Sequence, residues 1–583
     1  MLASLLCREK MKTCIFIISC ILLYSVPGTQ SFSYDYSATR KCLVKPRRPP
    51  YGGGIIVNPE FRNSIEGWKV FGKGEMKRGI SEDGNNFAVA YNRSGPLDSI
   101  SQKVQLEKGK LYSFSAWVQI SEGSETVATV FRAVNSEWIH GGYIIAKHGC
   151  WSLLKGGMVA NVSGLVEILF ECKNTIVDIW IDNVSLQPFT MEEWRSHQDK
   201  IIEKVRKTKV KLQATYANQT VFEGAVVSIK QTRPHFPFGC GMNHYILTSE
   251  AYRKWFSSRF KFTTFTNEMK WYSIEAIKGL ENYTVADAML RFAKENGISV
   301  RGHNILWDNP EHQPRWVQKL PPKKLRRAAM KRVNSVARRY SGQLIAWDVM
   351  NENLHFRFYE QNLGENASAE FHARTYHFDP HTRMFMNEYN TIECSEDEAA
   401  NPVQYIKKLE EILSYPSNKD MLVGIGLQGH FTSGQPNLVY MRSALDILGS
   451  TKLPIWLTEV DVDEGHNQAN YFEQILREGY SHPAVKGIII FGGPRIAGFN
   501  VTTLGDEDFK NTPAGDVVDK LIEEWKTGNL ELVTDSKGFA EVSLFHGDYE
   551  LTVKHPRSNF STTLSYKVEE EKFQETINLN IID

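Results

Sequence analysis

The sequence has almost no net charge and few cysteines. Its 68 Lys and Arg against 67 Asp and Glu give +1 over 583 residues, a balance that argues against a broad nucleic-acid or acidic-lipid surface. Five of the eight cysteines follow residue 28, and their scatter fits no zinc spacing. We therefore expect no metal site and no cofactor. Their odd number leaves at least one unpaired thiol, and we expect one disulfide among Cys42, Cys150 and Cys172.

The apolar run near the N-terminus is too short to cross a membrane comfortably. Cys14–Val26 reads CIFIISCILLYSV, with basic residues before it and Pro27-Gly28 after it. This pattern predicts a cleaved secretory signal over residues 1–28, with a signal anchor as the alternative. Secretion would permit glycosylation, and Asn-x-Ser/Thr acceptors occur at Asn92, Asn161, Asn183, Asn218, Asn282, Asn366, Asn500 and Asn559.

Changes in composition and in the spacing of apolar residues divide the rest of the chain into regions. Its length allows three or four domains. Residues 29–54 are rich in Ser, Pro and Gly and predict a linker. Residues 55–188 show short alternating strands without helical periodicity, which indicates an all-β jelly-roll sandwich. Residues 189–235 predict a bridging segment with a helix at Met191–Lys207 and two strands within Val210–Lys230.

Strands and helices then alternate over residues 236–526, the pattern of a (β/α)8 barrel. Residues 527–583 return to strands and predict a small C-terminal β-sandwich. The eight barrel strands are expected to start near Phe238, Phe262, Ile298, Leu344, Thr382, Leu422, Leu453 and Val485.

Two of these strands end in glutamate. The run Leu344–Asn353 reads LIAWDVMNEN and carries Glu352, and Leu453–Val462 reads LPIWLTEVDV and carries Glu459. Carboxylates at the ends of parallel strands are where barrel enzymes keep their chemistry. A pair of them suggests glycoside hydrolysis, in which one carboxylate attacks and the other carries a proton. The alternative is a capping or salt-bridging acid at each strand end.

Other strand ends are also polar, and six of them converging on one barrel mouth predict a single site. Asn351, Gln428 and His430 could instead be ordinary polar lining. The remaining candidates for substrate binding are Asn267, Lys270, His303 and Trp307.

The ordered motifs GHNILW, WDVMNEN, FMNEYN, GIGLQGHF and WLTEVDV resemble the strand ends of family 10 glycoside hydrolases, the (β/α)8 endo-xylanases. The layout resembles plant members with an N-terminal carbohydrate-binding module. The resemblance implies that Glu352 is the acid/base and Glu459 the nucleophile. It places Asn351, Gln428 and His430 around the sugar at the cleavage point. It places Asn267, Lys270, His303 and Trp307 on the glycone side.

Some positions depart from that pattern. Many members have Glu, His and Asp where this chain has Thr266, Asp308 and Glu388. The usual tryptophan-rich end of strand eight is replaced by FGGPRIAGFN, with Phe491, Arg495 and Phe499. This region normally walls the cleavage subsite, so substrate preference stays open.

The β-rich region also resembles secreted carbohydrate-binding modules, at Ile56–Trp68 and Asp178–Leu186. Trp68, Trp117 and Trp180 fit its core, because they lie in alternating apolar strands. Trp138, Tyr143 and Glu171 are the candidates for ligand binding in this module, with core packing or polar lining as the alternative.

Together these patterns predict a secreted retaining endo-1,4-β-xylanase that acts on plant cell-wall xylan. Its partner would be the polysaccharide, with no nucleic acid and no membrane after signal cleavage, and we expect a monomer. One alternative is a wall-binding protein with weak or no turnover. Another is a hydrolase or transglycosylase for a different β-glycan.

Overall fold

The computed structural model describes residues 32–133, 138–216, 218–554, 561–570, 572 and 574–581. The predicted signal peptide lies outside the described residues. Residues 35–583 form one compact unit, to which all elements below belong. Within the described ranges, no helix is long and apolar enough to cross a membrane.

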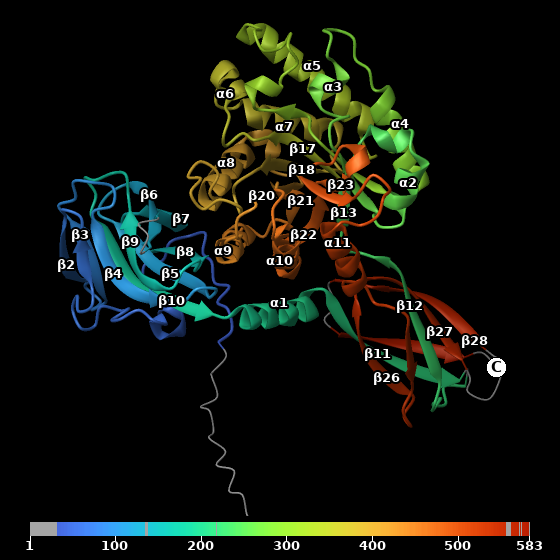
Figure 1. Cartoon of the computed structure of the whole chain (residues 1–583), viewed down its shortest axis with the longest axis horizontal. Helices are drawn as coiled ribbons and strands as arrows, with labels where there is room; N and C mark the ends of the chain where they lie inside the picture. The colour runs from blue at the N-terminus through green and yellow to red at the C-terminus, as the bar shows by residue number, and fades with distance from the viewer. Residues whose placement is uncertain are drawn as a thin grey trace, which may run out of the picture. The chain divides into compact units, whose positions relative to one another are not determined.

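The N-terminal part is a sandwich of two five-stranded antiparallel sheets, with strand orders β1-β4-β9-β6-β7 and β2-β3-β10-β5-β8. Alternating apolar residues of both sheets meet in one core that includes Phe114, Phe131 and Ile168. The predicted sandwich is therefore confirmed (Figure 1). Its strands are β1 (Lys69–Phe71), β2 (Glu75–Ile80), β3 (Asn86–Tyr91), β4 (Ser99–Leu106), β5 (Leu111–Ile120), β6 (Ser124–Arg132), β7 (Trp138–Lys147), β8 (Ser152–Val159), β9 (Gly164–Glu171) and β10 (Ile179–Phe189).

The described part of the predicted linker is tied to this sandwich. Cys42 forms a disulfide with Cys150, and the backbone of Leu43 pairs with that of Trp151. The short 3-10 helix η1 (Pro50–Gly53) contacts β10. The disulfide expected among three cysteines thus joins the first two, and Cys172 stays a buried free thiol.

The central part is a closed barrel of parallel strands, in which β15 pairs with both β14 and β17 to complete the ring. Each strand begins within two residues of its predicted start, which confirms the (β/α)8 fold. The strands are β13 (Phe238–Met242), β14 (Phe262–Phe265), β15 (Ser299–Gly302), β17 (Ala346–Asn351), β18 (Arg383–Glu388), β19 (Val423–Leu427), β21 (Ile455–Val462) and β22 (Val485–Ile490).

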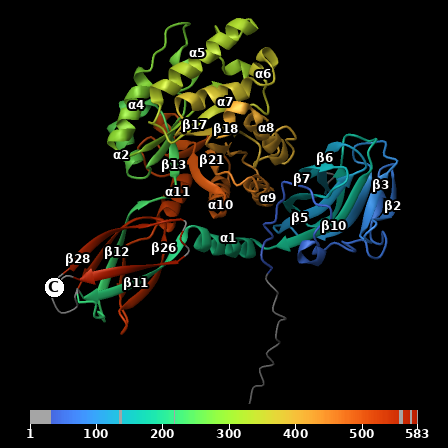
Figure 2. The same ribbon diagram turned by 180° about the vertical axis from the view of Figure 1, so that it is seen from behind.

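Helices pack around the outside of these strands, as the two opposite views show (Figures 1 and 2). In α5, Leu325, Ala329 and Val333 are buried on one face while most of the basic residues face solvent, which is the amphipathic pattern of a surface helix. The helices are α2 (Glu250–Ser257), α3 (Trp271–Ile274), α4 (Thr284–Glu295), α5 (Pro322–Tyr340), α6 (Phe358–Leu363), α7 (Ala367–Phe378), α8 (Pro402–Ser414), α9 (Leu438–Gly449), α10 (Gln468–Ser481) and α11 (Pro513–Glu524).

Short elements decorate the loops of the barrel. They are the 3-10 helices η2 (His244–Leu247), η3 (Pro310–His312), η4 (Pro416–Asn418) and η5 (Arg495–Ala497), and the strands β16 (Leu306–Trp307), β20 (His430–Phe431), β23 (Gly492–Pro494) and β24 (Thr502–Gly505).

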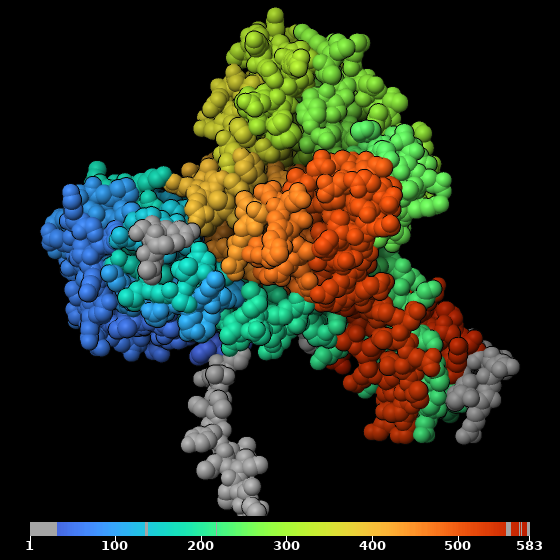
Figure 3. All heavy atoms as spheres, in the orientation of Figure 1, coloured from blue at the N-terminus to red at the C-terminus, as the bar shows by residue number. Residues whose placement is uncertain are grey.

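The C-terminal sandwich is larger than predicted, because two strands from the predicted bridging segment belong to it. After helix α1 (Met191–Val205), β11 (Lys207–Tyr216) pairs with β26 and β29, and β12 (Val226–Pro234) pairs with β25 and β27. In Figure 3 the green atoms of this segment lie among the red atoms of the C-terminal strands. The other strands are β25 (Leu530–Val533), β26 (Phe539–Phe545), β27 (Gly547–Lys554), β28 (Ser561–Val568) and β29 (Gln574–Ile581).

The physical reason lies in the alternating faces of β11 and β12. Val210, Leu212, Val227 and Ile229 point into a core that also contains Leu551 and other residues of the C-terminal strands. Without those strands, the apolar faces would meet water and the backbone edges would lack partners.

Candidate active site

The predicted site residues meet at one end of the barrel. Since the strands are parallel, their carboxyl ends open on the same side. A hollow of about 330 Å³ lies there. Of the nine predicted barrel residues, only Asn267 is not part of its lining. The lining residues are Lys270, His303, Trp307, Asn309, His312, Asn351, Glu352, Phe356, Tyr389, Gln428, His430 and Glu459.

Glu352 follows the last residue of β17 and is surrounded by uncharged donors. Its Oε1 accepts hydrogen bonds from Asn351 Nδ2 and Gln428 Nε2, each at 3.1 Å. Its Oε2 accepts one from Trp307 Nε1 at 2.6 Å. The side chain is nearly buried, since the residue is 7% exposed. Neutral donors hold the carboxyl group in place and add no full positive charge to it.

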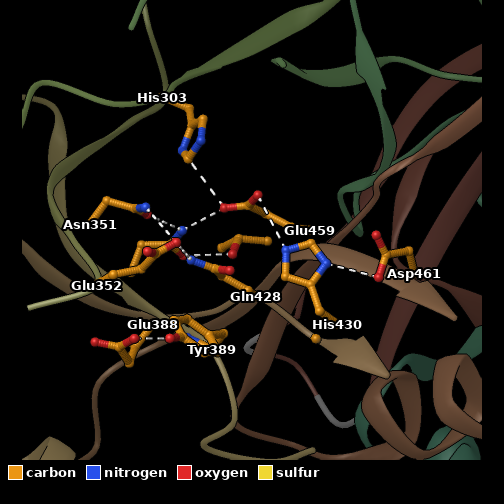
Figure 4. Close-up of polar contacts among 12 residues, drawn as sticks. His303, Asn351, Glu352, Glu388, Tyr389, Gln428, His430, Glu459 and Asp461 are labelled. Carbon is orange, nitrogen blue, oxygen red and sulfur yellow. Dashed lines mark hydrogen bonds and ion pairs between the residues drawn. The ribbon is translucent and has the colours of Figure 1, made fainter. Parts of the chain in front are cut away.

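Glu459 lies within β21 and has cationic neighbours instead. His303 Nδ1 lies 3.8 Å from its Oε1, and His430 Nε2 lies 3.6 Å from its Oε2, as Figure 4 shows. Burial opposes ionisation of this carboxyl group, but the interactions with His303, His430 and Lys270 outweigh it and lower its pKa. Glu459 is therefore an ionised carboxylate near neutral pH.

His430 owes its charge to two carboxylates. Its Nδ1 lies 2.8 Å from Asp461 Oδ1, while Nε2 faces Glu459. Burial favours the neutral ring, but Asp461 and Glu459 together raise the pKa of His430 well above its ordinary value. A protonated His430 presents one N–H to each carboxylate and so orients Glu459.

Asn387 connects the two glutamates, although the sequence did not single it out. Its Nδ2 donates to Asn351 Oδ1 at 2.9 Å and to Glu459 Oε1 at 2.7 Å. Its carbonyl oxygen Oδ1 accepts from the Thr458 hydroxyl at 2.6 Å. The FMNEYN motif contained the signal, since Asn387 lies one residue before the end of β18, and Asn351 ends β17.

Comparison with known proteins decides the family. The family described as glycosyl hydrolase family 10 matches residues 229–495, and a carbohydrate binding domain matches residues 53–157. Endo-1,4-beta-xylanase 5-like of Arabidopsis thaliana is 48% identical over 576 residues, which cover 97% of each chain. Endo-1,4-beta-xylanase 4 of the same plant is 44% identical over 573 residues, 96% of each chain.

The chain belongs to glycosyl hydrolase family 10.

In this family 10 chain, the glycone-side candidates gather around Trp307. Lys270 Nζ lies 4.6 Å from the centre of the Trp307 ring and 3.4 Å from Asn267 Oδ1. Burial lowers the pKa of Lys270, while Glu459 and Glu352 oppose that effect. His312, which sequence reasoning missed, stacks on Trp307 at a ring distance of 3.9 Å. Asn267 also accepts a hydrogen bond from the Tyr272 hydroxyl at 2.7 Å, so it is held beside the hollow.

The end of strand eight carries Phe491, Arg495 and Phe499. The Phe491 ring lies edge-on to His303 and His430, with ring centres 6.2 and 6.3 Å apart. Phe499 packs against Gly493, where a Cβ would come within 2.4 Å of its ring. Arg495 is exposed and lies 3.8 Å from Glu507. Phe491 thus packs behind two histidines that line the hollow of this family 10 chain.

Asp308 binds a backbone N–H and is not part of the lining of the hollow. It is buried, and its Oδ1 accepts the backbone N–H of Tyr359 at 2.9 Å, next to the start of α6. Burial raises the pKa of Asp308 to about 8.

The three residues predicted to bind a ligand in the carbohydrate module differ in their exposure and contacts. Trp138 is 39% exposed, packs edge-on against Phe71 and has the Arg132 guanidinium 5.4 Å from its ring centre, so part of its ring faces solvent. Glu171 is half-buried and lies 2.7 Å from His140 Nε2. The structure contradicts the prediction for Tyr143. It is only 4% exposed, and its hydroxyl donates to the Ser395 carbonyl at 2.9 Å, because a barrel loop packs over that part of the sheet.

The tryptophans assigned to the core follow the predicted pattern. Trp68 and Trp117 are buried. Trp180 is half-buried and stacks on Phe87 with ring centres 5.1 Å apart.

Proposed function

We propose that this family 10 hydrolase is a retaining endo-1,4-β-xylanase that cleaves plant cell-wall xylan by double displacement. The observation that carries the proposal is the pair of glutamates in one hollow with opposite surroundings. Glu459 is held ionised by cations, while Glu352 is held by neutral donors. One carboxylate suited to attack and one suited to carry a proton are what a retaining glycosidase requires. The curated relatives named endo-1,4-beta-xylanases support xylan as the substrate.

In the proposed mechanism, Glu459 attacks the anomeric carbon while Glu352 gives its proton to the leaving oxygen. The bond from sugar carbon to leaving oxygen breaks as the bond to Glu459 forms. Glu352, now ionised, takes a proton from water, and that water releases the sugar from Glu459. Asn387 touches both halves of the site and keeps them in register through the two steps.

Substitution of the two glutamates tests these roles. Glu459→Ala should release no detectable reducing sugar from xylan, because the variant lacks the nucleophile. Glu352→Ala should lower kcat/KM on xylan by about 10²- to 10⁴-fold, the usual contribution of a general acid. It should spare kcat/KM on dinitrophenyl β-xylobioside, whose leaving group needs no proton. Equal loss on both substrates would refute the acid role of Glu352.

A hydrolase or transglycosylase for another β-glycan is the second candidate. The packing of Phe491 against His303 and His430 favours testing it, since these two histidines line the hollow. A panel of xylan, glucan and mannan with product analysis separates the candidates. Binding without product release from any of them would favour a wall-binding protein.

We also propose secretion, on the basis of the N-terminal signal pattern and the acceptor sites. Asn366 and Asn500 are exposed and could carry glycans, whereas Asn183 is buried and should stay unmodified. Expression of the full chain in plant cells, with N-terminal sequencing and glycopeptide mapping of the culture medium, tests this. Retention of the whole product inside the cell would contradict it.

A further inference from the structure

Glu352 has a backbone conformation that needs support. Its φ is +62°, in the left-handed region that residues with a Cβ rarely adopt. Its own N–H is held by the Asn387 carbonyl at 2.8 Å. A strained conformation of this kind persists only where the surroundings enforce it, and such residues cluster at active sites.

Glu388 holds the backbone that follows. Its Oε2 accepts the N–H of Leu354 at 2.8 Å, and its Oε1 lies 2.8 Å from His355 Nδ1. One fully buried carboxylate therefore binds the residues two and three positions after Glu352. Glu388 closes β18, directly after the Asn387 that contacts Glu459.

His355 is fixed from both sides. Its Nε2 lies 2.7 Å from Asp397 Oδ2, and Asn390 Nδ2 donates to the same oxygen at 2.8 Å. Its ring stacks on Tyr389 at 3.9 Å, with 11° between the planes, and Tyr389 lines the catalytic hollow. Figure 4 shows Glu388 and Tyr389 beside Glu352.

The two neighbouring carboxyl groups favour a proton on each ring nitrogen of His355. Burial disfavours this charge, but Glu388 and Asp397 outweigh it and raise the pKa of His355 to about 9. A doubly protonated ring between two carboxylates cannot rotate without breaking a charge-assisted hydrogen bond.

We propose that Glu388, His355 and Asp397 form a positioning relay that holds the strained turn of Glu352 and so aligns its carboxyl group with the leaving oxygen. The relay touches neither sugar nor reacting atom, so its members are positioning residues. The inference rests on the acid–base role proposed above for Glu352. Loss of alignment would affect the proton transfer and leave the nucleophile Glu459 in place.

A comparison of two substrates isolates that effect. Glu388→Gln replaces one acceptor oxygen by an NH2 group. The two side-chain oxygens that face Leu354 and His355 are then no longer both present. We expect kcat/KM on xylo-oligosaccharides to fall about 10- to 100-fold, as for a misplaced catalytic group. On dinitrophenyl β-xylobioside, which needs no acid, we expect a change within about threefold.

His355 provides an independent pair of variants. His355→Leu removes both donors and should show the same split between substrates. His355→Gln keeps one side-chain N–H and should recover part of the lost rate on oligosaccharides. This pair keeps the test decisive even where Glu388→Gln folds poorly.

Glu478→Gln is the matched control. Glu478 is also fully buried and also pairs with a cation, Arg442, but it lies on α10 away from the hollow. We expect it to lower the melting temperature and to leave the ratio of the two kcat/KM values unchanged.

The outcomes separate the two proposals. Equal losses on both substrates, or no loss, in the Glu388 and His355 variants would overturn the relay. If Glu352→Ala itself shows no split between substrates, the acid role fails. If only Glu352→Ala shows the split, the acid role stands and the relay fails.

Discussion

Two residues of the same type differ here because their neighbours differ. Glu352 has amide and indole donors around it, while Glu459 has His303, His430 and Lys270. In the proposed mechanism, uncharged donors position the carboxyl group that gains and loses a proton. Cations stabilise the carboxylate that stays ionised. The side chains around each glutamate therefore determine which chemical role it suits.

Substitution of His430 tests how one positive charge affects the pKa of Glu459. His430→Asn removes a cation that lowers the pKa of Glu459, so that pKa should rise toward its ordinary value. Since only ionised Glu459 attacks in the proposed mechanism, the acid limb of the kcat/KM profile should move to higher pH. Hydrolysis of dinitrophenyl β-xylobioside across the pH range measures it. His377→Asn, at an exposed site on α7, is the control. An unmoved acid limb in His430→Asn would contradict the role.

At the same scale, sequence reasoning succeeded and failed for identifiable reasons. The meeting of Glu352 and Glu459 in one hollow was predictable, since each lies at or near the end of an apolar strand within a recognisable motif. Tyr143 was assigned wrongly, because alternation along β7 shows which face a side chain takes but not that Ser395 covers it. The tie between His355 and Asp397 joins residues 42 positions apart, and no local pattern indicates it.

Among the elements, β11 and β12 show how strand pairing can override chain order. Both precede the barrel in sequence, yet they pair with strands that follow it. Their alternating apolar residues predicted strands, and the structure confirms them. Which strands would be their partners depends on which distant apolar faces they meet in the folded chain.

Leu212 tests whether β11 is part of the C-terminal core. Its side chain is fully buried there, so Leu212→Ala should reduce the free energy of unfolding by about 2–5 kcal/mol. Lys209→Ala, at an exposed position of the same strand, should change it by less than about 0.5 kcal/mol. Chemical denaturation followed by fluorescence measures both. Similar stability in the two variants would contradict the assignment of β11 to this core.

For the whole molecule, the sandwich module and the barrel share buried contacts. Val403 of α8 belongs to the module's apolar core. At Gly157 of β8 a Cβ would lie 2.4 Å from Val439 Cγ1, so α9 packs closely against this strand. Lys155 of β8 forms a 2.5 Å ion pair with Asp446 of α9, and both side chains are almost wholly buried.

This ion pair predicts a dependence on both mutation and pH. Lys155→Met removes the ion-pair partner of buried Asp446 and should cost about 3–5 kcal/mol. Burial acts to raise the pKa of Asp446, but Lys155 and His482 outweigh it, so the folded-state pKa lies below the ordinary 3.8. The stabilisation is therefore complete well above pH 3.8 and declines as the pH falls below it.

Thermal unfolding of the variant from pH 3 to pH 7 measures this. Lys173→Met is the control, because its pair with Glu398 joins the same two regions at the exposed surface and should contribute at most about 1 kcal/mol. A Lys155→Met variant no less stable than Lys173→Met would contradict a buried ion pair between module and barrel.

The sequence by itself determined the order of the three folds, the positions of the barrel strands and the two glutamates. Each of these depends on patterns along a few consecutive residues, which local backbone geometry and side-chain polarity decide. Only the tertiary structure decided that Cys42 pairs with Cys150, that β11 and β12 complete the C-terminal sandwich, that Tyr143 is covered, and that Asn387 links the two glutamates. Those outcomes depend on which distant surfaces come into contact when the chain packs, and no single stretch of sequence contains that information.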